Sequence, residues 1–190
     1  MAKAHRYTVA AAFLPLLLLG ACVCLGSRPG AADWPLPDPA LAPFSGRISQ
    51  DVELRRGGGG VHFLAVLERQ KNGVLMVGLS PLGQRLLRVR WTARGVDADI
   101  APQAAPYLDA QAMLRELSFA LWPPESLDAA FKNGPFHADC TPGRRVLWQG
   151  NRERLVVGIH DGPGGREWTL GLTGQGAMIK VRALPSSATQ

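Results

Sequence analysis

The chain has 190 residues, of which 46% are hydrophobic, and its formal net charge is +6. The length predicts one domain with attached segments, and the apolar fraction suffices for a hydrophobic core. Two positive charges, Lys3 and Arg6, belong to the N-terminal leader, and the others are spread along the chain and form no basic motif with regularly spaced aromatic residues. We therefore expect no nucleic-acid partner, because such partners select clustered basic surfaces.

Residues 1–21 predict the signal peptide of a bacterial lipoprotein. A basic start precedes an apolar run at residues 9–19, which is too short for a permanent transmembrane helix. The following Leu19-Gly20-Ala21-Cys22 is similar to the lipobox, in which small residues precede the acylated cysteine. We expect Cys22 to be the first mature residue and to carry the membrane anchor, including a palmitate-type chain. An ordinary signal peptide with an incidental cysteine is the alternative.

The segment after Cys22 predicts where and how the domain is held. By resemblance to the sorting of enterobacterial lipoproteins, Val23 predicts the periplasmic face of the outer membrane. Residues 22–43 contain five prolines and predict an extended, unfolded tether. Cys24 and Cys140 remain in an oxidising compartment, and the pattern leaves open whether they form a disulfide or whether Cys140 is buried and free.

Residues 44–184 predict a mainly β domain, and residues 185–190 a disordered tail. Apolar and polar residues alternate at 87–91, 96–100, 167–172 and 177–183, which is typical of antiparallel strands with one solvated face. Residues 61–67 and 74–79 are apolar on both faces, so we expect a covering layer over those strands. Short turns such as Asn72-Gly73 favour a meander of neighbouring strands.

Two predicted helices interrupt the strands. Asp109 is a suitable N-cap for a helix that ends before Pro123 and Pro124. Pro124 then begins a second helix, which Asn133-Gly134 closes. The expected fold is therefore an incomplete antiparallel β-barrel, or half-barrel, covered by two short helices.

Three short motifs, in this order, resemble the LolA/LolB superfamily of periplasmic carriers. They are Phe44-Ser45-Gly46-Arg47-Ile48, Leu79-Ser80-Pro81-Leu82-Gly83 and Leu121-Trp122-Pro123-Pro124-Glu125-Ser126-Leu127. The run at residues 77–86 is similar to uncharacterised lipoproteins of that superfamily, some of them encoded beside aryl-polyene or fatty-acid-like synthesis genes. The chain departs from the LolB pattern at residues 57–67, where the hallmark tryptophan-bearing strand is absent.

The resemblance implies an outer-membrane lipoprotein that binds a hydrophobic or acylated cargo, which is a lipoprotein, a lipid or an aryl-polyene-like amphiphile. Expected partners are this cargo, the outer membrane through Cys22 and a periplasmic carrier protein; we expect a monomer without a cofactor or a metal. The apolar side chains expected to line the cargo cavity are Phe63, Leu67, Leu75, Val77, Leu87, Val89, Trp91, Met113, Leu117, Phe131, Trp148 and Trp168. Ordinary core packing is the alternative for each of them.

Leu82 stands in a predicted tight turn. The resemblance implies that this leucine protrudes and helps to deliver cargo into the membrane, where an exposed apolar side chain would have a purpose. The alternative is that Leu82 folds back onto the edge of the sheet.

The sequence argues against an enzyme. His62, His137 and His160 are isolated, and Cys140 would need a histidine brought within hydrogen-bond reach by the fold. The glycines at 57–60 precede a strand and lack the Lys-Ser or Lys-Thr of a phosphate-binding loop. A non-transport scaffold that binds an envelope protein through a sheet edge or an apolar patch is the second functional hypothesis.

Overall fold

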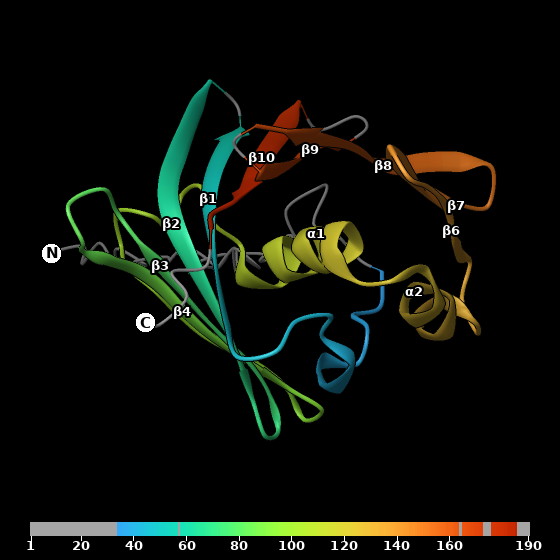
Figure 1. Cartoon of the computed structure of the whole chain (residues 1–190), viewed down its shortest axis with the longest axis horizontal. Coiled ribbons are helices and arrows are strands. Elements are labelled where there is room, and N and C mark those ends of the chain that lie inside the picture. Colours follow the sequence, from blue (N-terminus) through green and yellow to red (C-terminus); the bar gives the residue numbers. More distant parts are fainter. Residues whose placement is uncertain (1–33, 57, 164, 173–175, 186–190) are drawn as a thin grey trace, which may run out of the picture.

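The computed structural model describes residues 34–56, 58–163, 165–172 and 176–185. Its strands form one antiparallel sheet of ten, in the order β5-β4-β3-β2-β1-β10-β9-β8-β7-β6 (Figure 1). The strands are β1 (Arg47–Arg56), β2 (Gly59–Gln70), β3 (Gly73–Leu79), β4 (Arg85–Thr92), β5 (Gly95–Ile100), β6 (Phe136–Thr141), β7 (Arg144–Gln149), β8 (Arg152–Gly162), β9 (Gly165–Leu172) and β10 (Ala177–Ala183).

The sheet consists of two five-stranded meanders. The first half of the chain builds β1 to β5 and the second half builds β6 to β10, and the antiparallel pair β1 and β10 joins them. The edge strands β5 and β6 are not neighbours in the sheet, so the curved sheet stays open. The prediction of a mainly β half-barrel with a helical insert is confirmed.

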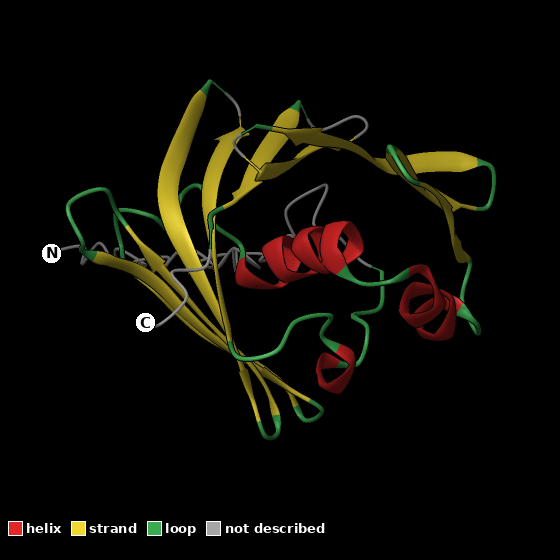
Figure 2. Ribbon diagram, viewed as in Figure 1, coloured by secondary structure: helices red, strands yellow, loops and turns green. Residues whose placement is uncertain are grey.

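Two helices lie between the halves of the chain and occupy the concave side of the sheet (Figure 2). Helix α1 (Ala110–Leu121) begins at Asp109, whose Oδ1 accepts hydrogen bonds from the backbone N–H groups of Gln111 and Ala112, both at 3.0 Å. Helix α2 (Pro124–Phe131) begins directly after the Pro123 that ends α1. Both predicted helices are confirmed.

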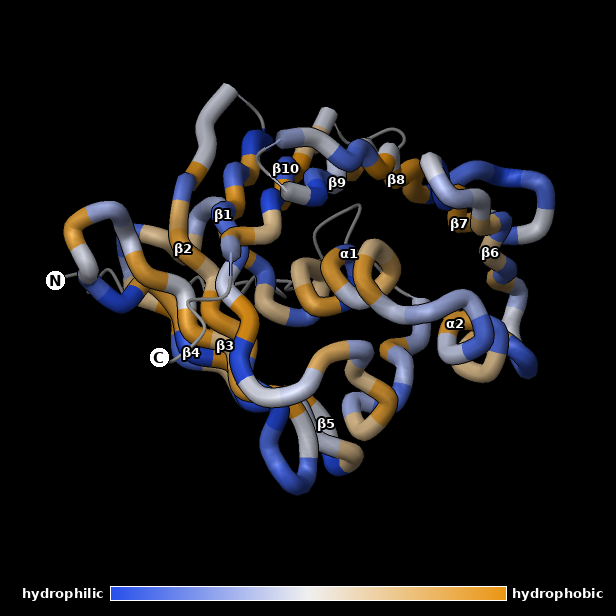
Figure 3. Tube along the Cα trace, viewed as in Figure 1, coloured by the Kyte–Doolittle hydropathy of each residue, from blue (hydrophilic) through white to orange (hydrophobic). Residues whose placement is uncertain are grey.

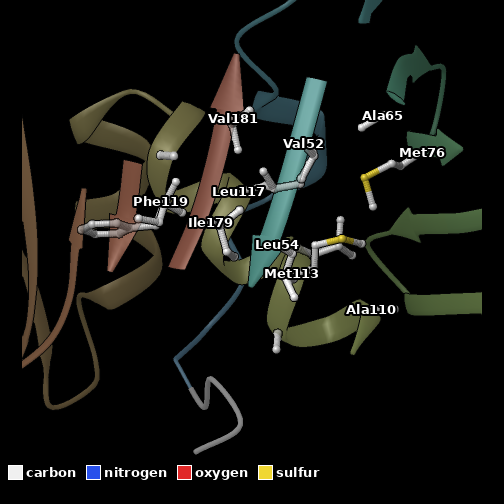
Figure 4. Packing of buried hydrophobic residues seen from close by; sticks show 14 of the residues in the cluster. Val52, Leu54, Ala65, Met76, Ala110, Met113, Leu117, Phe119, Ile179 and Val181 are labelled. Atoms are coloured by element: carbon white, nitrogen blue, oxygen red, sulfur yellow. The ribbon is translucent and has the colours of Figure 1, made fainter. Parts of the chain in front are cut away.

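The core lies between the concave face of the sheet and α1. Hydrophobic residues are frequent in α1 and alternate with hydrophilic ones along the strands of the sheet (Figure 3). Val52 and Leu54 of β1 face Met113 and Leu117 of α1, and each of these four side chains is at most 2% exposed (Figure 4). Burial of four such side chains contributes about 6–12 kcal/mol, so apolar packing is a large part of what holds α1 on the sheet.

The N-terminal part of the fold corrects the predicted tether. From Trp34 onward the chain packs on the domain. Trp34 is 1% exposed, and its backbone carbonyl oxygen accepts a hydrogen bond of 2.6 Å from Nε of Arg115. A short 3₁₀ helix, η1 (Pro39–Leu41), follows, and the carbonyl of Ala42 accepts a hydrogen bond of 2.9 Å from Nη1 of Arg69. The prolines prevent strand pairing in this segment, but they do not prevent burial of a large indole.

The predicted signal peptide, Cys22, Cys24 and residues 186–190 of the predicted tail lie outside the described residues. Within the described part of the chain, no helix has both the length and the hydropathy that a membrane crossing requires.

Candidate functional site

Eight of the twelve predicted cavity residues meet between the sheet and the helices. They come from β2, β4, α1 and α2, and each is at most 4% exposed: Phe63, Leu67, Leu87, Val89, Trp91, Met113, Leu117 and Phe131. Packing among them is tight, because a Cβ added at Gly78 would collide with Cδ2 of Leu87. In this structure, side chains fill the part of the hollow around these residues, so a ligand would enter it by displacing α1.

Three predicted cavity residues lie on the convex face instead. Val74 and Met76 face the helices, so the alternate residues Leu75 and Val77 of β3 point away from them. Their partners in β4 are Arg90 and Arg88, whose long side chains explain why both are only half-exposed. Because β3 is apolar on both faces, its sequence did not identify the inward face.

Trp148 is the third correction. The pairing of β7 with β8 shifts between Leu147 and Trp148, and Leu147 belongs to the core. The indole of Trp148 stacks on His137 with ring centroids 6.3 Å apart, and its Nε1 donates to Oδ2 of Asp139 at 2.9 Å. Both partners are exposed residues of β6, so Trp148 lies outside the hollow.

Trp168, the last predicted cavity residue, lines a pocket of about 450 Å³ where α1 meets α2 above β6, β8 and β9. Leu121, Ile159 and Trp168 supply apolar surface, and the exposed residues Asp161 and Arg166 lie at its solvent side. Most of the exposed lining of this pocket is polar, and the apolar residues supply the smaller part.

Arg145 connects this pocket to the helices. Its Nη1 donates to the carbonyl oxygens of Phe119 at 2.9 Å and Trp122 at 2.5 Å, which belong to the C-terminal turn of α1. A cation is favourable at this end of a helix. Burial lowers the pKa of Arg145 and raises that of Cys140, which lines the same pocket.

The sheet and α1 also meet in a buried ion pair, which the sequence analysis missed. Glu116 of α1 is 1% exposed, and its Oε1 lies 4.0 Å from Nη2 of Arg56 at the end of β1. Neither carboxylate oxygen of Glu116, nor Nε of Arg56, has a hydrogen-bond partner among the described residues. The available signal was a charged residue within the apolar stripe of an amphipathic helix, which also contains Ala112, Met113 and Leu117.

The carboxyl of Glu116 titrates near neutral pH. Burial raises its pKa from 4.5 to about 7; Arg56 opposes this shift and Asp109 adds to it. Arg56 also lines a second pocket, of about 530 Å³, at the hairpin between β1 and β2. Arg56 therefore lies between Glu116, which it approaches to 4.0 Å, and this pocket, which it lines and Glu116 does not.

Leu82 protrudes from the turn between β3 and β4. Its side chain is 86% exposed, so it does not fold back onto the sheet edge. The hydroxyl of Ser80 accepts hydrogen bonds from the backbone N–H groups of Leu82 at 3.3 Å and Gln84 at 3.2 Å, and Gly83 has a positive φ of 77°. This tight turn holds the leucine away from the domain.

The candidate nucleophile and the histidines lie on opposite faces. Cys140 packs toward the core, whereas the described histidines, His62, His137 and His160, are exposed on alternate positions of their strands. His62 pairs through Nε2 with Oδ1 of Asp51 at 2.5 Å. No group of three or more His, Cys, Asp or Glu residues in the described ranges has the arrangement of a metal site.

Residues 47–178 match the model of a family described as "Protein of unknown function (DUF3261)". The match covers more than half of the chain, which therefore belongs to this family. It runs from the start of β1 into β10 and includes both helices, both pockets described above and the pair of Glu116 and Arg56. No curated protein matches the chain.

Proposed function

We propose that this member of the DUF3261 family is an outer-membrane lipoprotein, anchored through acylated Cys22 at the periplasmic face, that binds a hydrophobic or acylated cargo and helps to place it in the membrane. A lipoprotein, a lipid and an aryl-polyene-like amphiphile are the cargo classes, and kinship with the LolA/LolB superfamily is part of the proposal. The observation that carries it is an open sheet whose apolar concave face is covered by a pair of helices.

A bound acyl chain would have to displace side chains of α1 from the sheet, because these side chains already occupy the hollow. Ten buried CH₂ groups of an acyl chain would contribute about 8 kcal/mol. Uncovering three side chains such as Met113, Leu117 and Phe119 would cost about 5–9 kcal/mol at roughly 1.5–3 kcal/mol each. The two terms nearly cancel, so an acyl chain would bind reversibly and would pass to a bilayer without a nucleotide.

The pocket at the junction of α1 and α2 is the proposed entrance. Trp168 and Leu121 line it next to the C-terminal end of α1. The side chain of Arg145 connects the sheet to the C-terminal end of α1 through two hydrogen bonds. An acyl chain that advances from the pocket would displace this end of α1 first. The exposed Leu82 is the proposed contact with the receiving membrane.

Tryptophan quenching tests the binding site. The chain from residue 22 with Cys22→Ser retains every described residue and lacks the acylation site. We expect a brominated fatty acid to quench its fluorescence with a stoichiometry near one. Trp168→Phe should decrease the quenched fraction, because it removes a fluorophore at the pocket, whereas Trp148→Phe should increase it, because Trp148 lies on the convex face. Absent quenching, or equal effects of both variants, would contradict the proposed site.

The Leu82 turn gives a second expected result. Leu82→Glu should leave the thermal unfolding midpoint unchanged, because the side chain is 86% exposed, and should slow transfer of a bound fluorescent fatty acid to liposomes at least severalfold. Met178→Glu is the matched control, since Met178 is an exposed apolar residue of β10 away from that turn. A lowered unfolding midpoint, or equal transfer rates in both variants, would argue that Leu82 has no delivery role.

A non-transport scaffold is the second candidate function. One observation favours it: the convex face of β2 and β3 carries half-exposed aliphatic side chains, namely Leu64, Val66, Leu75, Val77 and Leu79. Such a patch suits a protein partner. A scaffold would bind no fatty acid in the quenching titration.

A further inference from the structure

We propose that Glu116 and Arg56 form a subsite for the polar end of the cargo, and that this end is an uncharged group with both a hydrogen-bond donor and an acceptor, such as the amide of an N-acylated amphiphile. The inference rests on the proposed function and specifies its cargo class.

The first argument is the unsatisfied hydrogen-bonding capacity of the pair. Both oxygens of Glu116 can accept a hydrogen bond and Nε of Arg56 can donate one, and none of these atoms has a partner among the described residues. Buried polar groups are nearly always paired, because a buried group without a hydrogen bond destabilises the fold. Two free acceptors beside one free donor are complementary to a group that donates and accepts.

The second argument is charge. Above about pH 7, where Glu116 is ionised, an anionic group would be attracted by Arg56 but repelled by the Glu116 carboxylate, which lies 4.0 Å from the guanidinium. A cationic group would be attracted by Glu116 but repelled by Arg56. An uncharged amide or hydroxyl hydrogen-bonds to both residues without an uncompensated charge in a buried site, where such a charge is most unfavourable.

The third argument is position. Arg56 lines the pocket of about 530 Å³ at the β1–β2 hairpin, together with Leu54 and Gly59. The ring of Tyr107 packs closely against Gly59 of this pocket, because a Cβ on Gly59 would lie 2.7 Å from Cε1 of Tyr107. Glu116 precedes Leu117, which faces the apolar side chains of β1 (Figure 4). A polar group at Glu116 would thus lie next to the helix position whose side chain packs on the apolar residues of β1.

A pair of uncharged probes with the same tail tests the subsite. The chain from residue 22 with Cys22→Ser is loaded with a fluorescent fatty acid, which is then displaced by hexadecanamide or by methyl hexadecanoate. The amide donates and accepts, whereas the ester only accepts. We expect the amide to bind about tenfold more tightly than the ester, which corresponds to one additional hydrogen bond to a charged group.

The variants decide whether Glu116 is responsible. Glu116→Leu should reduce the preference for the amide to less than twofold, and its folding is expected to persist because Arg56, which loses its partner, is 29% exposed and can reach solvent. Glu125→Leu, at an exposed position of α2, is the matched control and should keep the tenfold preference.

Two outcomes overturn the subsite. If amide and ester bind equally well to the unsubstituted chain, or if the preference survives in Glu116→Leu, the pair does not recognise a polar group, while the carrier function stands. If neither probe displaces the fatty acid and no fatty acid binds, the proposed function itself fails, and the subsite with it.

Discussion

The stability of this protein is expected to fall by about 3 kcal/mol between pH 4.5 and pH 7, and Glu116→Gln should abolish that fall. The pKa of Glu116 is raised by burial to about 7 in the folded chain, against 4.5 as its ordinary value. Over this interval the unfolded chain releases the proton and the folded chain retains it, so rising pH favours unfolding. A difference of about 2.5 pKa units corresponds to roughly 3 kcal/mol.

Urea unfolding at several pH values measures this effect. Below pH 4.5 the carboxyl is protonated in both states, and the two proteins should differ little. Above pH 7 the Glu116→Gln variant should be more stable by about 3 kcal/mol, with the difference developing between these limits. Glu125→Gln, exposed on α2, should show no such pH-dependent difference. Parallel stability curves for Glu116→Gln and the unsubstituted chain would contradict burial of an ionisable carboxyl.

Arg145→Met is expected to lower the free energy of unfolding by about 2–6 kcal/mol and to accelerate fatty-acid exchange. The guanidinium donates to the carbonyls of Phe119 and Trp122. Its removal leaves two partly buried acceptors without their donor, at about 1–3 kcal/mol each. The helix end that it holds is also the end beside the proposed entrance, so its release should speed both uptake and loss of the ligand.

Arg144→Met provides the control for this experiment. Arg144 precedes Arg145 in β7, is exposed, and lies 3.7 Å from the carboxylate of Glu153. A surface ion pair contributes about 0–1 kcal/mol, so this variant should remain close to the unsubstituted chain in stability. Exchange rates are measured by stopped-flow displacement of a fluorescent fatty acid. Equal stability losses in the two variants, or a destabilised Arg145→Met with unchanged exchange, would show that α1 does not gate the hollow.

The two expected results probe different contacts of the same helix. Glu116 lies within α1 and Arg145 contacts its C-terminal turn. If α1 is a movable cover, the two substitutions should change ligand exchange in addition to stability. If α1 is a permanent part of the core, both should change stability alone, and the scaffold hypothesis gains support.

The sequence by itself determined the elements and their order. Alternation of polar and apolar residues identified one solvated face per strand, and short turns such as Asn72-Gly73 required antiparallel neighbours. Asp109 and the two prolines at 123–124 set the helix ends, because capping and the missing proline N–H act within one turn. The turn at Leu82 was also readable locally, since its geometry depends on Ser80 and Gly83, but the sequence left open whether the leucine protrudes or folds back.

Only the tertiary structure decided which apolar residues face the helices. Leu75 and Val77 belong to a strand that is apolar on both sides, and a shift in pairing at Trp148 depends on the neighbouring strand. Glu116 and Arg56 pair although they are 60 positions apart in the sequence. Trp34 is buried although its segment has no periodic pattern of apolar residues. Periodicity is a local property, whereas face selection, burial and charge pairing depend on distant partners, and those partners meet only after the sheet has curved around α1.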